Sequence, residues 1–322
     1  LQSIDKYAFS DCTGLISITI PATVQFIGKG AFAKCNKLES IIVDTSNSYF
    51  RSIDGILFSN DLTTLLHFPD NHPFTEYEIP SSVNIIAAHS FSFCSNLQTI
   101  FIPSSVTFIG YMSFCLCTAS IIFSDSSNLA YIERDAFCKV KLPNHFSIPP
   151  KTKWIGENAF NCASLESIVI PSTVETIGNI AFSDCENLTM ISVDPNNPFF
   201  SSFEGVLFSK DKKQLLFYPP KKPSLHFRIP DSVELIAPSV FSGCKHLQSL
   251  FIPSSVKFQC GPFDCASDEI ESVTSIIIQS GKIDPEITAN FRLLDTISIL
   301  SDHSHFDFSE LPGDIEVTFP SE

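Results

Sequence analysis

One stretch decides the fold of this chain: Ala31-Phe32-Ala33-Lys34-Cys35-Asn36-Lys37-Leu38-Glu39-Ser40-Ile41-Ile42-Val43. Its apolar positions follow the pattern A-F-x-x-C-x-x-L-x-x-I-x-V. The same pattern stands 23 residues earlier, where it begins at Ala8 and has its cysteine at Cys12. Self-similarity with a fixed period of roughly 20 to 50 residues is typical of solenoids, so the chain is interpreted as a series of coils.

A second block completes each coil. Ile20–Gly28 and Ile170–Gly178 share the pattern I-P-x-x-V-x-x-I-G. The alternation I-x-I before the proline favours a short strand with two residues pointing inward, and proline ends the strand because it lacks an N–H. We predict that Val24, Ile27 and Phe32 contact the core from a turn or short helical segment. One coil cannot bury its apolar face alone, so the coils must stack.

A longer repeat of 150 residues is superimposed on the short one, which indicates an internal duplication. Each half also contains a variant unit whose two apolar segments are separated by turn residues such as Asn60-Asp61, and we interpret this unit as a coil carrying a β-hairpin or a second sheet layer. The matched segments are Phe101–Val106 with Phe251–Val256, Asp54–Ser59 with Glu204–Ser209, and Leu65–Pro69 with Leu215–Pro219.

The periods predict a leucine-rich repeat solenoid over residues 1–322 as a single domain. Regular repeats cover residues 1–252, and irregular repeats with strand-like pairs such as Ile276/Ile278 cover 253–322. We expect a right-handed, curved superhelix, mostly strand and loop with short helical turns, with a parallel sheet on its concave side. Its strands centre on Ile18–Ile20, Ile41–Val43, Ile100–Ile102, Ile168–Ile170, Ile191–Val193 and Leu250–Ile252.

The repeat unit and the D-G-I-L-F-S variant at Asp54–Ser59 resemble the BspA-type leucine-rich repeat family. The resemblance implies surface display or secretion, and binding of host, neighbouring-cell or extracellular-matrix proteins. It would make the chain a non-enzymatic recognition and adhesion module in cell–cell or host–microbe contact. An intracellular interaction scaffold is the alternative, which reduced cysteines and the lack of a visible signal peptide favour. The full-length precursor would distinguish the two.

Composition excludes some function classes. The net charge is −15, with no basic stripe, so a nucleic-acid partner is not expected. No apolar run of about 18 residues is present to span a membrane. The chain begins at Leu1 in mid-repeat, so we expect it to be part of a longer protein, with any signal or anchor outside it.

No motif for catalysis, a metal or a cofactor stands out, so we expect neither an enzyme nor a cofactor. The histidines are expected to be exposed, as at His67, His89 and His246. The segment Asp302–Asp307 contains two histidines and two aspartates that could bind a metal, but a solvated loop is the favoured interpretation. Asn187 begins an N-glycosylation motif, although Leu188 takes the buried leucine position.

The cysteines form two groups. Seven are expected to be a ladder of buried thiols at the repeat's cysteine position. Cys115 and Cys138 instead directly follow the repeat's phenylalanine and are 23 residues apart, so they occupy equivalent places on adjacent coils and could form a disulfide. The alternative is two reduced, partly exposed thiols. The ladder positions are Cys12, Cys35, Cys94, Cys117, Cys162, Cys185 and Cys244.

The middle residue of each I-x-I strand should face solvent on the concave side. Six of the nine middle residues are apolar, which suggests a surface for a protein ligand or for self-association. Strand propensity alone is the alternative, since β-branched and aromatic residues favour strands wherever they point. The candidate binding residues are Thr19, Ile42, Phe101, Ile122, Val169, Ser192, Phe251 and Ile277, with Ser298 as the ninth middle residue.

Overall fold

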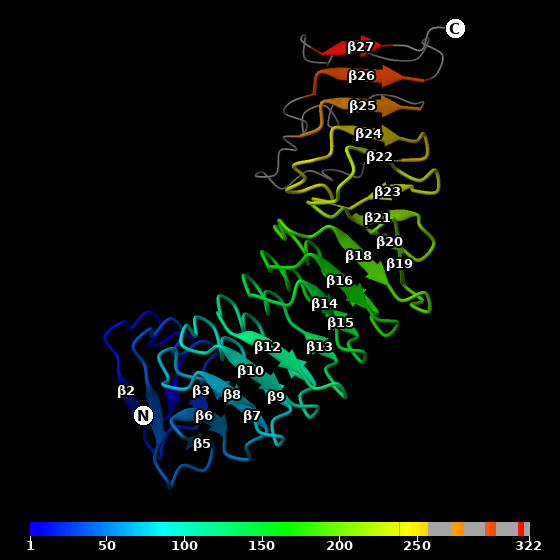
Figure 1. Cartoon of the computed structure of the whole chain (residues 1–322). Helices are drawn as coiled ribbons and strands as arrows, with labels where there is room; N and C mark the ends of the chain where they lie inside the picture. The colour runs from blue at the N-terminus through cyan, green and yellow to red at the C-terminus, as the bar shows by residue number, and fades with distance from the viewer. Residues whose placement is uncertain (238, 257–271, 280–293, 301–314, 319–322) are drawn as a thin grey trace. The chain divides into compact units, whose positions relative to one another are not determined.

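The structure, a computed structural model, describes residues 1–237, 239–256, 272–279, 294–300 and 315–318. The described residues form a β-solenoid, which confirms the fold inferred from the period (Figure 1). The chain divides into two compact units. Unit 1 comprises Leu1–Leu165 and Thr173–Phe182, and unit 2 comprises Glu166–Ser172 and Ser183–Glu322. A single domain over residues 1–322 stays a prediction.

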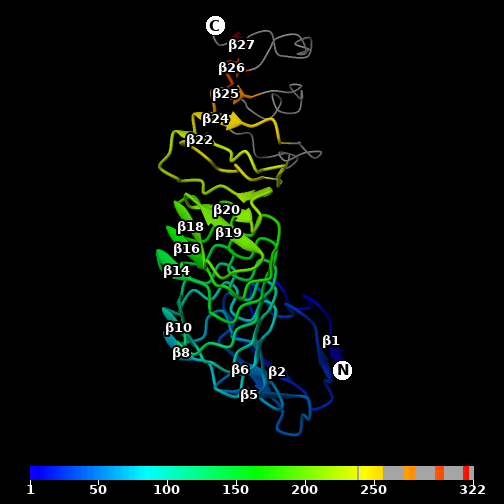
Figure 2. The same cartoon turned by 90° about the vertical axis from the view of Figure 1, so that its right-hand side faces the viewer.

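Long strands of three or four residues contain the I-x-I pairs. Ile41 and Val43 are buried while Ile42 between them is exposed, as the alternation predicts. In unit 1, β8, β10 and β12 form one parallel sheet on one side of the unit (Figure 2). In unit 2 the parallel sheet runs β22-β24-β25-β26-β27, which confirms that strand pairs continue beyond Pro253. The long strands are β2 (Ser17–Ile20), β4 (Ser40–Val43), β8 (Glu76–Glu78), β10 (Thr99–Ile102), β12 (Ser120–Phe123), β14 (His145–Ser147), β16 (Ser167–Ile170), β18 (Met190–Val193), β22 (His226–Arg228), β24 (Ser249–Ile252), β25 (Ser275–Ile278), β26 (Thr296–Ile299) and β27 (Glu316–Thr318).

Short strands of two residues end at the isoleucine that the repeat places in its I-G pair, and in four of them glycine follows that isoleucine. Five of them lie in a second sheet of unit 1, which runs in the order β17-β15-β13-β11-β9, followed by β7, β6 and β5. Their second residue points into the core, and Ile86, Ile109 and Ile155 have no exposed surface. The short strands are β1 (Ser3–Ile4), β3 (Phe26–Ile27), β9 (Ile85–Ile86), β11 (Phe108–Ile109), β13 (Tyr131–Ile132), β15 (Trp154–Ile155), β17 (Thr176–Ile177) and β23 (Leu235–Ile236).

The expected helical turns are wrong, since no helix occurs among the described residues. Each coil instead turns through two residues in the left-handed region, placed two positions before and after the repeat's phenylalanine. Around Phe91 these are His89 and Phe93, with φ of 60° and 64°. A right-handed helix needs consecutive negative φ values, so this pattern interrupts any helix within one turn.

The variant units are three-stranded antiparallel insertions, which confirms the predicted hairpins. In unit 1, β5 (Phe50–Ile53), β6 (Ile56–Ser59) and β7 (Thr64–His67) follow one another, and unit 2 has β19 (Phe200–Phe203), β20 (Val206–Ser209) and β21 (Gln214–Phe217). Asp54-Gly55 joins β5 to β6 with φ of 50° and 81°. Two positive φ values and the Asp-Gly pair are typical of a type I′ turn.

A ladder of stacked phenylalanines fills unit 1. Neighbouring rings on adjacent coils lie 5.2–5.7 Å apart, with planes within 26° of parallel. One such ring per coil is buried, so each coil presents the same shape to the next, and this maintains the coil-to-coil register. The ladder comprises Phe68, Phe91, Phe114, Phe137, Phe160 and Phe182.

Candidate functional site

The outward middle residues of the long strands form the strand face. Four apolar candidates are exposed, namely Ile42 (51%), Ile122 (46%), Val169 (42%) and Phe101 (38%). Thr19 is exposed as well, and Ser192, Phe251 and Ile277 are half-buried. Strand pairing brings the candidates together two or three at a time. The pairs in register are Thr19 with Ile42, Phe101 with Ile122, Val169 with Ser192, and Phe251 with Ile277, which is followed by Ser298.

Polar residues that the sequence analysis missed interrupt the strand face. Glu78 on β8 pairs with Phe101, and Arg228 on β22 pairs with Phe251. The signal was available, because Y-E-I-P and F-R-I-P at residues 77–80 and 227–230 are I-x-I-P units with an aromatic first residue. Ser147 on β14 is a third exposed polar residue at this position. The candidates therefore form separate apolar patches with charged or hydroxyl neighbours.

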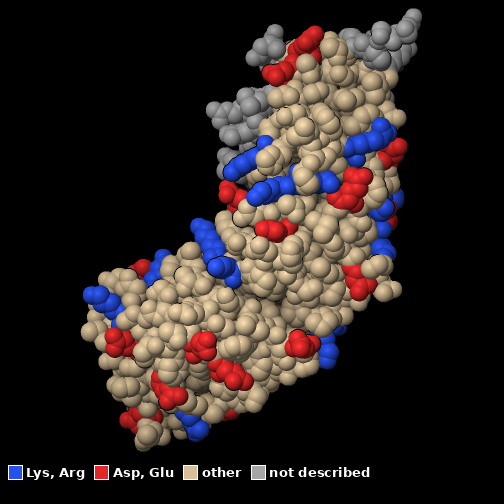
Figure 3. All heavy atoms as spheres, in the orientation of Figure 1, with Lys and Arg blue, Asp and Glu red and all other residues tan. Residues whose placement is uncertain are grey.

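The best-defined patch is a groove on the strand face of unit 1. Its volume is about 320 Å³, and Phe101 and Ile122 line it together with Glu78. Pro103 and Ser104, which follow β10, also line it. The groove combines two apolar side chains in register with one carboxylate. Figure 3 shows that most of the surface of unit 1 seen from this side is neither acidic nor basic.

The equivalent patch of unit 2 has the opposite charge. Arg228 lies over the ring of Phe251, with its guanidinium carbon 3.8 Å from the ring centroid, and forms an ion pair with Asp231 at 3.1 Å. Glu78 and Arg228 are 150 residues apart, so the duplication kept the phenylalanine and reversed the neighbouring charge. The two patches therefore differ in the charged residue that pairs with the phenylalanine.

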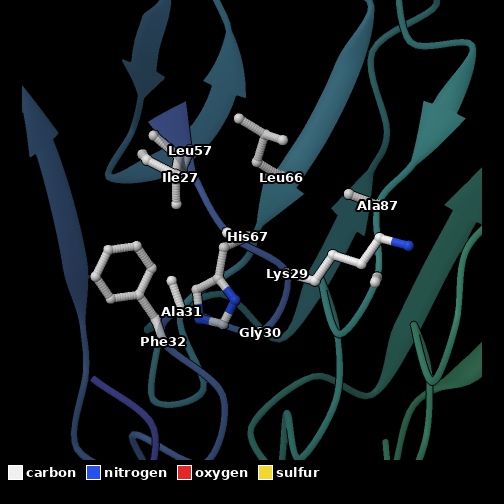
Figure 4. A pocket seen from close by; sticks show the side chains of 11 residues that line it. Ile27, Lys29, Gly30, Ala31, Phe32, Leu57, Leu66, His67 and Ala87 are labelled. Carbon is white, nitrogen blue, oxygen red and sulfur yellow. The ribbon is translucent and has the colours of Figure 1, made fainter. Parts of the chain in front are cut away.

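A second feature of unit 1 is a small pocket of about 80 Å³ beside His67 (Figure 4). The ring of His67 lies next to Ala31 and Phe32, and its Nε2 is 3.8 Å from Oδ1 of Asp70. Burial raises the pKa of Asp70 to about 7 and lowers the pKa of His67 to about 3. Both groups are therefore neutral in mildly acidic solution, so the contact is not an ion pair there.

The expected exposure of two histidines is wrong. His67 is 3% and His89 5% exposed, because β7 of the insertion and a coil corner direct them into unit 1, while His246 is exposed as expected. Nε2 of His89 lies 3.0 Å from the Tyr7 hydroxyl. No group of three or more His, Cys, Asp or Glu in the described ranges could hold a metal ion, and residues 302–307 lie outside those ranges.

The comparison with family models decides the relationship. The model described as the BspA type leucine rich repeat region matches six copies, over residues 1–72, 65–189 and 217–307. The chain belongs to the BspA-type leucine-rich repeat family. Proteins of this family are repeat proteins that typically bind other proteins.

Three solved bacterial protein structures are similar to this chain. A leucine-rich repeat protein from Eubacterium ventriosum is 26% identical with a TM-score of 0.61, and the match covers 70% of this chain and 60% of that protein. The chain thus spans less than two thirds of that relative. The pneumococcal vaccine antigen PcpA also matches, with 20% identity and a TM-score of 0.48, over 100% of this chain and 80% of that protein. A leucine-rich cell surface protein from Faecalibacterium prausnitzii matches with 20% identity and a TM-score of 0.45, over 94% of this chain and 84% of that protein. Comparison with curated proteins finds no match.

The BspA-type cysteine position is mostly as predicted, with two departures, since Cys12 is partly exposed instead of buried and Cys162 lies outside the position. Six of the seven ladder cysteines occupy the slot, but Ala163 takes it on the seventh coil, where its N–H donates to the Phe160 carbonyl at 3.0 Å. Cys162 instead stands at the left-handed corner, with φ of 53°. Because this position points away from the core slot, Cys162 is partly exposed.

Cys115 and Cys138 lie on adjacent coils, as their spacing predicts. The Leu116 N–H donates to the Cys138 carbonyl at 3.0 Å, which holds the two backbones side by side. A hydrogen bond with Cys138 and burial raise the pKa of the Cys115 thiol well above its usual range. The two thiols are thus in contact, and a disulfide between them stays a prediction.

Asn187 has an exposed side chain, whose Oδ1 accepts a hydrogen bond from Lys221, and the following Leu188 is fully buried. Glycosylation at this position stays a prediction. No helix in the described part of the chain is long and apolar enough to cross a membrane.

Proposed function

We propose that this chain is a non-enzymatic protein-recognition module that binds its ligand through the strand face. The groove of unit 1 carries the proposal, because Phe101 and Ile122 are exposed, adjacent and in register over a rigid sheet. Exposed contiguous apolar area marks interaction surfaces, and aromatic side chains commonly supply much of the binding energy. The family's usual role in binding proteins supports this assignment.

The ligand is proposed to be a protein of another cell, of a host, or of the extracellular matrix. The protein would be displayed on the cell surface or secreted, as the family resemblance implies, and would take part in adhesion. Glu78 at the rim of the groove favours a ligand segment in which an apolar residue neighbours a basic one, since opposite charges across a rim speed association and reject unsuitable partners.

An intracellular scaffold is the second candidate. The ladder thiols favour it, because Cys35 and Cys117 are buried and burial raises their pKa to about 11 and about 12, which suits reduced, unreactive cysteines. Labelling of intact cells with a membrane-impermeant reagent distinguishes the two. Labelling of the protein supports surface display, and labelling only after lysis supports the scaffold.

The binding proposal is tested with Phe101→Ser combined with Phe251→Ser. Partners are first captured by the purified protein from surface extracts, and one confirmed partner is then titrated. We expect an unchanged melting temperature and a loss of affinity of about tenfold or more, since a hot-spot residue contributes more than about 1–2 kcal/mol. The matched control replaces two exposed phenylalanines away from the strand face, Phe26→Ser with Phe199→Ser. Equal affinity of parent and test variant, or equal losses in both double variants, would refute the proposal.

A further inference from the structure

The short strands of unit 1 carry a second exposed surface, the aromatic row, which consists of Ile85, Phe108, Tyr131 and Trp154. These are the first residues of β9, β11, β13 and β15, and each pairs in parallel register with the next. Tyr131, Trp154 and Ile85 are 47%, 44% and 39% exposed. Figure 1 shows β9, β13 and β15 following one another along the unit. The row belongs to a different sheet from the strand face.

The fold does not require aromatic side chains at these positions. The same position holds Ser3 on β1, Thr64 on β7, Thr176 on β17 and Gln214 on β21. Threonine has a high strand propensity and would suffice if propensity alone decided the residue. Four consecutive coils instead carry large apolar side chains at this position, three of them exposed and Phe108 half-buried, which costs solubility unless the surface is used.

The Phe108 ring does not cover the face of the neighbouring Tyr131 ring. The centroids of Phe108 and Tyr131 are 6.4 Å apart and the ring planes are tilted by 40°, so the two rings do not stack on each other. The Tyr131 hydroxyl and the Trp154 indole N–H add a polar group to each exposed ring. Such side chains suit a ligand that has flat apolar faces and hydroxyl groups at the edges of those faces.

The charges beside the row are already neutralised. Lys153, next to Trp154, forms an ion pair with Glu175 at 3.2 Å, and Arg134 on the neighbouring coil lies 3.6 Å from Glu157. The surface therefore offers little net charge to attract a charged partner, and an uncharged ligand can bind there without breaking a favourable charge interaction. The net charge of −15 further disfavours anionic membranes.

We propose that the aromatic row binds an extended, neutral polysaccharide whose sugar rings lie against successive side chains of the row. Adjacent strands are about 4.8 Å apart, and an extended chain of hexoses advances by a similar distance per sugar. A sugar has an apolar C–H face that packs on an aromatic ring, and hydroxyl edges that reach polar groups. The spacing of the side chains along the row thus matches the spacing of the sugars along the polysaccharide. This binding does not involve the strand face.

Trp154 provides the assay, because it is the only tryptophan of the chain. The full chain is titrated with soluble hexasaccharides of β-1,4-glucan, β-1,3-glucan and α-1,4-glucan, and with glucose, while tryptophan emission is recorded. We expect a saturable change in emission with at least one hexasaccharide and none with glucose at the same sugar concentration. Tyr131→Ser should weaken that binding about fivefold, as expected for the loss of one aromatic contact.

Phe26→Ser is the matched control, since Phe26 is also the first residue of a short strand but pairs with Ser3 outside the row. It should leave the affinity unchanged, as should the strand-face double variant, so that failure here and failure of the proposed function are distinguishable. The proposal is overturned if no hexasaccharide binds, or if Tyr131→Ser and Phe26→Ser have equal effects. It is also overturned if tryptophan emission changes only as the protein concentration is raised and sedimentation shows a dimer, because the row would then bind a second copy of the chain. A change of emission only on addition of neutral lipid vesicles would overturn it as well.

Discussion

Replacing Asp70 by asparagine should stabilise the protein, by an amount that grows with pH. Burial raises the pKa of Asp70 to about 7, whereas in the unfolded chain it has its ordinary value near 3.8. Between these two values the folded protein keeps a proton that the unfolded chain has lost. The stabilising effect of this proton is complete below about pH 4 and is lost as the pH rises through 7.

The magnitude follows from the shift. About three pKa units correspond to at most about 4 kcal/mol, at about 1.4 kcal/mol per unit. His67, whose Nε2 is 3.8 Å away, has a pKa lowered to about 3 and is too weak a base to take the proton of Asp70. The penalty is therefore not relieved by proton transfer, and we expect a difference of about 2–4 kcal/mol. Asparagine has the same shape and does not ionise. The equivalent residues of unit 2 are Phe217 and Pro220, so the fold does not need a carboxylate there.

The assay is urea unfolding of both proteins, followed by circular dichroism at pH 4.5, 6, 7 and 8. Asp70→Asn should exceed the parent by only about 1 kcal/mol at pH 4.5, where the unfolded carboxyl is already mostly ionised, and by the full difference at pH 8. The lowered pKa values of His67 and His89 reduce stability as the pH falls, but they do so in both proteins and cancel in the difference. A difference that is constant over this range, or that shrinks as the pH rises, would refute the reasoning.

Asp61→Asn is a control with the opposite sign. Hydrogen bonds from the Ser59 hydroxyl and from Thr63 hold the pKa of this exposed carboxyl below its usual value. Asp61 therefore stabilises the fold above its unfolded pKa, and this contribution is lost as the pH falls through the folded pKa. The variant should be less stable than the parent at neutral pH and equal to it in strong acid.

Three further predictions concern stability and cysteine chemistry. The buried Asn47 side chain makes four hydrogen bonds of 2.8–3.0 Å to backbone groups, so Asn47→Ala should lower the free energy of unfolding in urea by about 2–4 kcal/mol. Replacement of the exposed Ser46 by alanine should lower it by under about 0.5 kcal/mol, and equal losses would contradict this account. Ile180 has φ of 49°, which a β-branched residue rarely adopts, so Ile180→Asn should raise stability by about 0.5–1 kcal/mol, and a loss would show that its side-chain packing matters more. Incubation with oxidised glutathione should link Cys115 to Cys138 in non-reduced peptide maps, and recovery of both as alkylated thiols would exclude the disulfide.

The repeat itself was readable from the sequence. Two inward apolar residues two positions apart, followed by proline, predicted the long strands, because the side-chain alternation of a strand is a local property. The hairpin insertions were equally readable from their turn residues. The helical turns were not correctly predicted, since spacings of three to five fit a helix as well as a corner, and only the left-handed φ values of residues such as His89 and Phe93 distinguish them.

The candidate sites were predicted only in part. The sequence by itself determined the coil period, the exposed middle position of each long strand, and the pairing of Phe101 with Ile122, because each depends on residues within one or two coils. The tertiary structure alone decided that Glu78 lies beside Phe101, that His67 and Asp70 are buried, and that Tyr131 and Trp154 form one surface. Whether a side chain is buried, and which side chains lie beside it, depends on residues contributed by other coils, and a local sequence pattern does not specify those residues.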